Sequence, residues 1–250
     1  MSTSGTADVV FCIDASKSMQ HCIEEVKKHV GSFSEGLKTG GQYRLDVRMD
    51  FNAFSTAAVK DGGATRNVFK NRSVFEGDSW YALYKGRQGK FFTNSTEEFR
   101  ASLSGVKASG NESTLVSLDY ALDYPWRPAD TCHRVVILLT DEPCEQGVYI
   151  DQQKDKLDAL IAKIQALRVA LFIVGPDSVM FDQLAAADRC EYTVVSGGDG
   201  LAGVDFRKVL ETIGKSVSKS AQQQEAKVTV ERGIFGQPTW GPTQLWAEGD

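Results

Sequence analysis

The chain has 250 residues, of which 42% are hydrophobic and 24% are charged. This ordinary globular composition excludes a disordered, collagen-like or coiled-coil chain, and the length allows one to two domains with a full core. The formal net charge of −5 argues against nucleic acid or an anionic membrane surface as the main partner. No apolar run approaches the ~18 residues that a membrane-spanning helix needs, so we expect neither a membrane segment nor a membrane partner.

Apolar runs and alternating patterns predict the strands. Residues 1–7 are small and polar, and we expect them to form a short leader. Three continuous apolar runs are typical of strands buried on both faces of a parallel sheet, and they cover residues 7–13, 134–140 and 169–174. Strict alternation over 43–51 predicts a strand with one charged face, near an edge of the sheet. The pattern loosens over 52–93, where we expect a long, partly irregular excursion with a short strand around Tyr81.

Apolar residues spaced three and four apart predict helices between and after these strands. The stripes span residues 19–37, 115–122, 157–167 and 206–217, and a capping-box spacing at Ser95 and Glu98 predicts a further helix. Strands that alternate with helices indicate an α/β fold. We expect a Rossmann-like, doubly wound and mostly parallel sheet with helices on both faces.

The composition changes after residue 218, and we expect residues 219–250 to form a tail rather than a domain. A glutamine-rich stretch is followed there by glycine, proline and tryptophan. The plain interpretation is a solvated terminus. The alternative is a docking segment, because the aromatic side chains of Phe235, Trp240 and Trp246 are costly to leave exposed and aromatic residues anchor interfaces.

Cysteine usage and the N-terminus predict a cytoplasmic location. The chain has five cysteines, an odd number, and no CxxC pair. We therefore expect reduced thiols rather than disulfides. Residues 1–7 also lack the basic start of a secretory signal peptide.

Oxygen-bearing side chains gather where two of the predicted core strands end. Asp14, Ser16 and Ser18 directly follow the first apolar run and open a helix, and Asp141 ends the second run. In an open α/β sheet, ligands bind where the carboxyl ends of strands meet helix N-termini. The loop before the next helical stripe offers Thr114, so three loops can converge on one crevice.

The chemistry of this set favours a hard divalent cation. Two carboxylates and three hydroxyls are oxygen ligands suited to Mg²⁺ or Mn²⁺. The carboxylates roughly balance the charge of the ion, and the hydroxyls add none, so the ion keeps an open position for a further anionic oxygen. We expect an Asp or Glu of a partner protein to fill that position. Taken singly, a serine can cap a helix and an aspartate is common in turns, but their joint occurrence in this order favours a metal site.

The arrangement of strand, DxSxS motif and helix at Asp14, Ser16 and Ser18 resembles the von Willebrand factor type A domain and its metal-ion-dependent adhesion site. The downstream threonine loop and the apolar strand ending in Thr-Asp belong to the same resemblance, which covers roughly residues 8–218. It implies a six-stranded sheet with one antiparallel edge strand. It also implies a function in binding other proteins rather than in catalysis.

Carried over position by position, the resemblance implies a role for each residue of the set. Ser16 and Ser18 would bind the ion directly, whereas Asp14 and Asp141 would bind it mainly through water. Thr114 would switch between direct and water-mediated contact.

Two positions depart from the pattern of this family. Lys17 stands where glycine is common in the middle of the motif, and it adds a positive charge beside the site. The threonine loop lacks the usual Gly-Gly-Thr, so Ser113 is an alternative hydroxyl ligand to Thr114, and Glu112 is a candidate additional carboxylate or supporting residue.

Within this family, residues 91–122, followed by YPWRP and TDEPC, are similar to the intracellular type A domains attached to alpha-type protein kinases. A second similarity is to bacterial intracellular type A proteins encoded with kinases, phosphatases or AAA ATPases in stress and conflict systems. We therefore expect an intracellular adaptor in signalling or stress response whose partner is a kinase, phosphatase or ATPase.

Two rival functions remain at this stage. A phosphatase-like hydrolase using Asp14 with Mg²⁺ would want a second acid two residues on, where Ser16 stands. Hydrolysis with Ser16 as the nucleophile would need a base, and His21 is the sole histidine near by. A dinucleotide enzyme would need GxGxxG in the first turn, which is missing. We therefore expect no enzymatic activity. The other rival is a metal-independent scaffold that binds through the aromatic tail.

Overall fold

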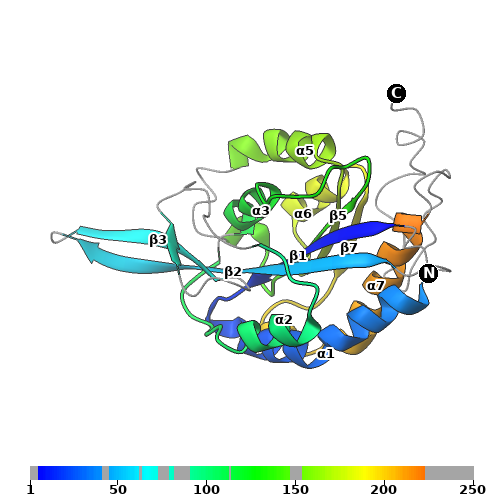
Figure 1. Cartoon of the computed structure of the whole chain (residues 1–250). Coiled ribbons are helices and arrows are strands. Elements are labelled where there is room, and N and C mark those ends of the chain that lie inside the picture. The colour runs from blue at the N-terminus through cyan, green and yellow to red at the C-terminus, as the bar shows by residue number, and fades with distance from the viewer. Residues whose placement is uncertain are drawn as a thin grey trace.

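The computed structural model describes residues 5–40, 45–61, 64–72, 79–81, 91–112, 114–146 and 154–222. Seven strands in this part of the chain form one sheet in the order β4-β3-β2-β1-β5-β6-β7 (Figure 1). Their bounds are β1 (Thr6–Asp14), β2 (Asp46–Asp61), β3 (Ala64–Arg72), β4 (Ser79–Tyr81), β5 (His133–Leu139), β6 (Val169–Gly175) and β7 (Cys190–Val194).

The predicted α/β class is confirmed, and the sheet differs from the expected one in strand number. The strands β2, β1, β5, β6 and β7 run parallel to one another, whereas β3 and β4 are antiparallel to their neighbours. The resemblance implied six strands with one antiparallel edge strand. The described residues instead contain seven strands, with two antiparallel strands at one edge.

The strand expected over 43–51 does not lie near an edge. It is the first half of β2, which lies between β3 and β1, because β2 runs on to Asp61 and pairs there with β3. Its charged face is stable in the interior of the sheet, since Arg48 pairs with Asp8 and Asp50 accepts backbone hydrogen bonds.

The part of the segment 52–93 that the structure describes is more regular than its sequence pattern indicates, and residues 62–63, 73–78 and 82–90 lie outside the described residues. It contains the rest of β2, all of β3, and β4, which is the short strand expected around Tyr81. Phe54 of β2 pairs with Asp14 at the end of β1, and β2 continues beyond this pair. The antiparallel pair of β2 and β3 therefore extends past the carboxyl edge of β1, as Figure 1 shows.

Helices cover both faces of the sheet. One face carries α1 (Gln20–Thr39), α2 (Thr96–Leu103) and α7 (Phe206–Gln222), and the other carries α3 (Thr114–Leu122), α5 (Leu157–Ala166) and α6 (Val179–Ala185). Among the described residues the regular elements begin at Thr6 and end at Gln222, slightly beyond the expected limits of 8–218. No helix in the described part of the chain is both long and apolar enough to cross a bilayer.

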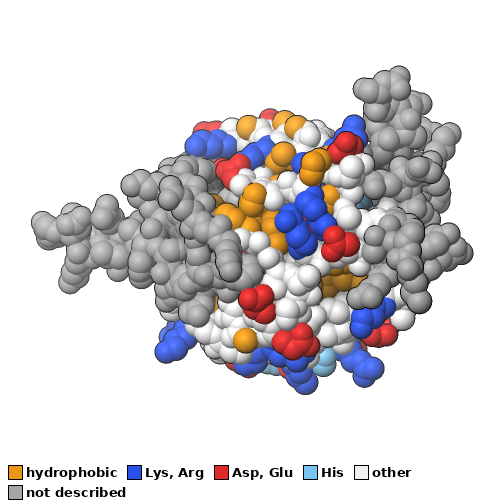
Figure 2. Space-filling model, in the orientation of Figure 1, with side chains coloured by type: hydrophobic (Ala, Val, Ile, Leu, Met, Phe, Trp, Pro, Cys, Tyr) orange, Lys and Arg blue, Asp and Glu red, His pale blue; other side chains and the backbone are white. Residues whose placement is uncertain are grey.

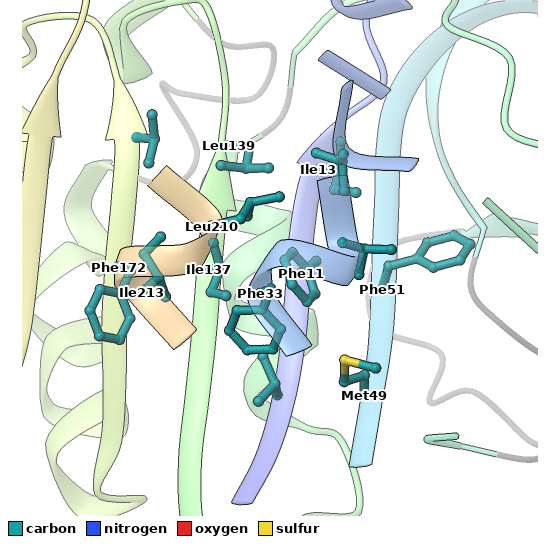
Figure 3. Close-up of a cluster of buried hydrophobic side chains, with 14 of the residues drawn as sticks. Phe11, Ile13, Phe33, Met49, Phe51, Ile137, Leu139, Phe172, Leu210 and Ile213 are labelled. Carbon is teal, nitrogen blue, oxygen red and sulfur yellow. The ribbon is translucent and has the colours of Figure 1, made fainter. Parts of the chain in front are cut away.

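The two helical layers explain why the core strands are apolar without alternation. Successive side chains of β1 point to opposite faces, so Val9, Phe11 and Ile13 pack under α1 and α7 while Val10 and Cys12 pack under α3 and α5. In the first layer, Phe11 lies edge to face with Phe33 of α1 and with Phe99 of α2, at 5.3 Å between ring centroids in each case. Figure 3 shows this cluster, which joins the central strands to α1 and α7.

The helices α1 and α7 pack backbone against backbone. A Cβ on Gly36 would lie 2.2 Å from the carbonyl oxygen of Glu211, and a Cβ on Gly214 would lie 2.3 Å from that of Phe33. Glycine at both positions therefore permits the close approach. On the face shown in Figure 2, acidic and basic side chains are interspersed over the described surface, which agrees with the small net charge.

Candidate metal centre

The two aspartates of the predicted site lie at the same edge of the sheet. Asp14 ends β1, and Asp141 follows the end of β5, which pairs with β1 in parallel up to Ile13 and Leu139. Both aspartates are fully buried. The carboxyl ends of two central strands thus bring together residues that are far apart in sequence.

Neutral donors surround the carboxylate of Asp14. Its Oδ1 accepts a hydrogen bond of 2.7 Å from the backbone N–H of Ser16, and its Oδ2 accepts one of 2.8 Å from the hydroxyl of Thr140. Burial raises the pKa of Asp14 to about 7 against the lowering effect of these hydrogen bonds, and the charge of Glu112 raises the pKa further. The ionised form of Asp14 is therefore costly without a nearby cation.

The serines of the motif connect to Asp141. The hydroxyls of Ser16 and Ser18 lie 3.3 Å apart, and Ser18 donates a hydrogen bond of 3.0 Å to Oδ1 of Asp141. The backbone N–H of Gly200 donates to Oδ2 of Asp141 at 2.8 Å. A chain of polar contacts therefore joins Asp14, Ser16, Ser18 and Asp141, as the sequence predicts for one site.

Helix capping does not account for these serines. Ser16 is the N-cap of the short helix η1 (Lys17–Met19), but its side chain makes no capping hydrogen bond. The N-cap of α1 is Met19, so Ser18 does not cap that helix either. Both hydroxyls are instead directed into the polar chain that ends at Asp141.

Thr114 provides the third predicted hydroxyl. It is the first residue of α3 and is 3% exposed, and its Oγ1 finds no hydrogen-bond partner among the described residues. Burying a hydroxyl without a partner costs about 1–3 kcal/mol, so this hydroxyl is a candidate ligand. Ser113, the alternative hydroxyl, lies outside the described residues.

The loop before α3 is held against the aspartate–serine motif. The backbone N–H of Ser109 donates to the carbonyl oxygen of Ala15 at 2.7 Å, and that of Lys17 donates to Gly110 at 3.4 Å. Asn111 exchanges two backbone hydrogen bonds with Thr56 of β2. Glu112 follows directly and is half-buried, and its charge raises the pKa of Asp14, so the loop carrying Glu112 and Thr114 belongs to the same site.

Three residues of the site escaped the sequence interpretation. Thr140, which the sequence shows only as the end of an apolar strand, donates to Asp14, and Gly200, which does not stand out in the sequence, donates to Asp141. Gly110 has φ +80°, and a Cβ there would lie 1.7 Å from the carbonyl oxygen of Thr56, so only glycine lets the loop approach β2. A glycine directly before the loop residues 111–114 was the signal in the sequence that could have indicated this close approach.

The donor set fits a hard divalent cation. Within the described ranges, no three His, Cys, Asp or Glu side chains are grouped so as to hold a metal. The candidate centre instead combines two buried carboxylates with hydroxyls, among them the Oγ1 of Thr114, for which the described part of the chain offers no partner. Oxygen ligands of this kind suit Mg²⁺ or Mn²⁺ and not softer metals. The Lys17 side chain is exposed, so its charge lies at the rim of this set.

The fold and the site together define an open α/β domain with a candidate cation centre at the carboxyl edge of its sheet. No protein-family model matches the chain. Over 175 residues the chain is 27% identical to alpha-protein kinase vwkA of Dictyostelium discoideum. The match covers 66% of this chain and 24% of the kinase, so the chain spans about a quarter of that relative's length.

Solved structures identify the fold. A von Willebrand factor type A protein from Catenulispora acidiphila superposes with a TM-score of 0.51 at 16% identity, over 86% of this chain and 43% of that one. The PilB minor pilin from Streptococcus sanguinis gives a TM-score of 0.52 at 10% identity, over 88% and 63% of the two chains. The pilus adhesin SpaC from Lactobacillus rhamnosus GG gives 0.50 at 13% identity, over 88% and 32%. The chain therefore has the von Willebrand factor type A fold, and the resemblance seen in the sequence is confirmed at the level of the fold.

Proposed function

We propose that this chain is a protein-interaction module that binds an Asp or Glu side chain of a partner through a divalent cation. The type A fold supports an interaction module in general terms. The observation that carries the finer proposal is the connected set of Asp14, Ser16, Ser18 and Asp141, together with the buried hydroxyl of Thr114, which has no hydrogen-bond partner among the described residues.

The residues that would hold the ion are the hydroxyls of Ser16, Ser18 and Thr114 and the carboxylates of Asp14 and Asp141. A bound Mg²⁺ or Mn²⁺ supplies a positive centre that attracts a further anionic oxygen. The two carboxylates offset the charge of the ion, and the hydroxyls orient around it without adding negative charge. Ser113 and Glu112 stay alternative contributors, because both lie directly before Thr114.

The proposal assigns no catalytic step to the chain. A hydrolase would need a base beside Asp14 or Ser16, and two of the histidines are engaged elsewhere. His29 pairs with Glu25 on α1 at 3.3 Å, and His133 lies at the start of β5, away from the carboxyl edge. Burial lowers the pKa of His133 to about 3, so it stays neutral.

We further propose that the module acts in the cytoplasm, in signalling or stress response, with a kinase, phosphatase or AAA ATPase as its partner. The five cysteines all lie within the described residues, and none of them forms a disulfide, which suits a reducing compartment. The similarity to part of an alpha-protein kinase supports a kinase-linked role.

The test measures binding of the chain to an immobilised peptide with a single Glu between neutral residues. We expect binding in Mg²⁺ that EDTA reverses and that Asp14→Ala and Asp141→Ala abolish. Asp158→Ala, which removes an exposed carboxylate on α5, is the matched control and should bind as the wild type does. Binding that persists in EDTA, or in both site variants, would contradict the metal-dependent function and would point to the tail residues Phe235, Trp240 and Trp246, which lie outside the described residues.

A further inference from the structure

The first half of β2 is paired with a strand on one side only. It pairs with β1 along residues 46–54, but its pairing with β3 begins at Ala53. Before that point the described residues pair with its outer side at Met49, which exchanges two backbone hydrogen bonds of 2.7 Å with Thr93. The backbone groups of alternate residues point to the same side of a strand, so those of Val47 point outward as well. Among the described residues, no strand pairs with Val47 on that side.

The helix α7 ends beside the start of β2. A Cβ on Gly5 would lie 3.0 Å from Cδ2 of Leu45 and 3.2 Å from the carbonyl oxygen of Ala221. Gly5 also accepts a hydrogen bond of 3.1 Å from the backbone N–H of Asp46. Because α7 ends at Gln222, one residue after Ala221, the chain leaves the helix next to the first residues of β2.

The sequence after α7 contains a strand-like pattern. Residues 228–231 are Val-Thr-Val-Glu, in which two valines alternate with polar residues. Leu45 and Val47 alternate with Asp46 and Arg48 in the same way, and both pack partly buried against the cluster under α1 and α7. Five residues separate α7 from the pattern. In extended form they span about 16 Å, or about three strand spacings, so the pattern reaches the start of β2.

The hand of the connection favours the outer side of β2 over the outer side of β7. Crossovers between parallel strands are almost always right-handed, so crossovers over opposite faces run in opposite directions along the sheet. The helix α1 leads from β1 toward the β4 edge over one face, and α5 and α6 lead toward the β7 edge over the other. Because α7 shares the face of α1, its connection to a following parallel strand is right-handed only toward the β4 edge. The outer side of β2 lies in that direction.

We propose that residues 228–231 add to the sheet as a short strand, parallel to β2 and paired with the outer side of its first half. The two valines share a face with Leu45 and Val47, and Glu231 lies beside Arg48. A shift by one residue would exchange the apolar and polar faces, so the alternation sets this register. The added strand covers backbone groups that would otherwise be open to pairing with another chain.

This inference concerns the amino edge of the sheet and does not depend on a bound cation. It makes the start of the tail a part of the domain. The aromatic residues that follow, Phe235, Trp240 and Trp246, are then tethered to the domain at the end of this strand rather than carried on a wholly solvated terminus.

Hydrogen exchange of the Val47 amide, measured by NMR on the full chain in EDTA, tests the pairing. Thr229→Pro places a proline, which has no N–H, inside the proposed strand, and Thr243→Pro makes the same change in the tail outside it. We expect slow exchange in the wild type and in Thr243→Pro, and exchange at least about tenfold faster in Thr229→Pro. The amide of Leu138 in the central strand β5 is the internal reference and should exchange equally in all three chains.

A charge reversal tests the register. Glu231→Lys places a like charge beside Arg48 and should speed the exchange of the Val47 amide by about two- to fivefold, as for partly exposed ion pairs. Glu248→Lys reverses a charge near the end of the tail and should leave the exchange unchanged.

Each contrary outcome overturns a stated part of the proposal. Equal exchange of the Val47 amide in the wild type and in Thr229→Pro overturns the docking of the strand. Protection that is lost when the wild type is diluted assigns the pairing to a second copy and overturns docking within one chain. Protection that Thr229→Pro removes from β7 instead of Val47 places the strand at the other edge. A full effect of Thr229→Pro with none of Glu231→Lys overturns the register.

Discussion

Two aspartates on β1 are fully buried, and only one of them has cationic partners among the described residues. Asp8, near the start of the strand, accepts hydrogen bonds at 2.6–2.8 Å from the guanidinium groups of Arg48 and Arg127 and from the backbone N–H of Arg127. Asp14, at the end of the strand, accepts hydrogen bonds from the backbone N–H of Ser16 and the hydroxyl of Thr140, both of which are neutral donors. One end of the strand therefore holds a compensated carboxylate, and the other holds an uncompensated one.

The pKa values of the two aspartates follow this difference. Burial alone would raise the pKa of Asp8, but the hydrogen bonds and charges of Arg48 and Arg127 hold it below its usual value. Burial raises the pKa of Asp14 to about 7, and no cationic side chain of the described residues is among the groups that shift it. Removing one partner from a buried carboxylate–arginine network is costly, whereas a buried carboxylate without such partners fits the cation centre that we propose.

The largest expected effect is on stability at the compensated end. Asp8→Ala should lower the free energy of unfolding by about 3–5 kcal/mol, because it leaves two guanidinium groups without their buried partner. Asp14→Ala should change the stability of the metal-free chain little or raise it. Urea unfolding in EDTA measures both. A loss below about 1 kcal/mol in Asp8→Ala would mean that the Asp8 network contributes no more than a surface ion pair, and would contradict the difference between Asp8 and Asp14.

The pH dependence of stability should separate the same two aspartates. A carboxyl whose folded pKa is raised contributes stability below its unfolded pKa of 3.8, and this contribution is lost as pH rises toward the folded pKa of about 7. The metal-free wild type should therefore lose up to about 4 kcal/mol relative to Asp14→Asn between pH 4 and 7.

Asp8 gives the opposite sign. Its folded pKa is lowered, so its contribution is present above 3.8 and is lost as pH falls through the folded value. Thermal unfolding in EDTA at a series of pH values measures the two trends. Parallel curves for the wild type and Asp14→Asn from pH 4 to 7 would show that Asp14 carries no ionisation cost.

Added metal should stabilise the chain through Asp14, at the end of β1, and not through Asp8. At about one hundred times its Kd, Mg²⁺ should raise the free energy of unfolding by about 2.7 kcal/mol, since it binds the folded state. Asp14→Asn should lose this gain, and Asp158→Ala should keep it. Thermal unfolding with Mg²⁺ and with EDTA gives the comparison, and an equal gain in Asp14→Asn would place the binding elsewhere.

The smallest expected effect is that of Thr114→Val on the metal-free chain. The hydroxyl has no partner among the described residues, so its replacement by a methyl group should change stability by less than about 1 kcal/mol or raise it. The same variant should weaken Mg²⁺ binding, which calorimetry measures. A large loss of stability without metal would reveal a structural role for the hydroxyl.

The comparison of Asp8 with Asp14 also shows how far the sequence predicts this molecule. Continuous apolar runs located the central strands, and Asp8 lies within one of these runs. Its role could not be predicted, because its partner Arg127 lies 119 residues away in the sequence. Asp14, Ser16 and Ser18 were predictable because a local motif follows a strand. Their connection to Asp141 needed only the rule that parallel strands end at a common edge.

What escaped prediction depends on contacts distant in sequence or on polar strands. The second half of β2 pairs with β3 through antiparallel backbone hydrogen bonds, and this pairing does not require an apolar sequence pattern. The donors Thr140 and Gly200 bind the two aspartates from 126 and 59 residues away, and only the fold brings them there. The α1 and α7 contact at Gly36 and Gly214 likewise arises from packing.

The measurement that tests the central claim most directly is a calorimetric titration of Mg²⁺ into the metal-free chain, with wild type and Asp14→Asn side by side. Binding of a cation at the carboxyl edge predicts saturable heat in the wild type and its loss in Asp14→Asn. Equal titration curves for the two chains would contradict the claim that this buried, uncompensated carboxylate binds a cation.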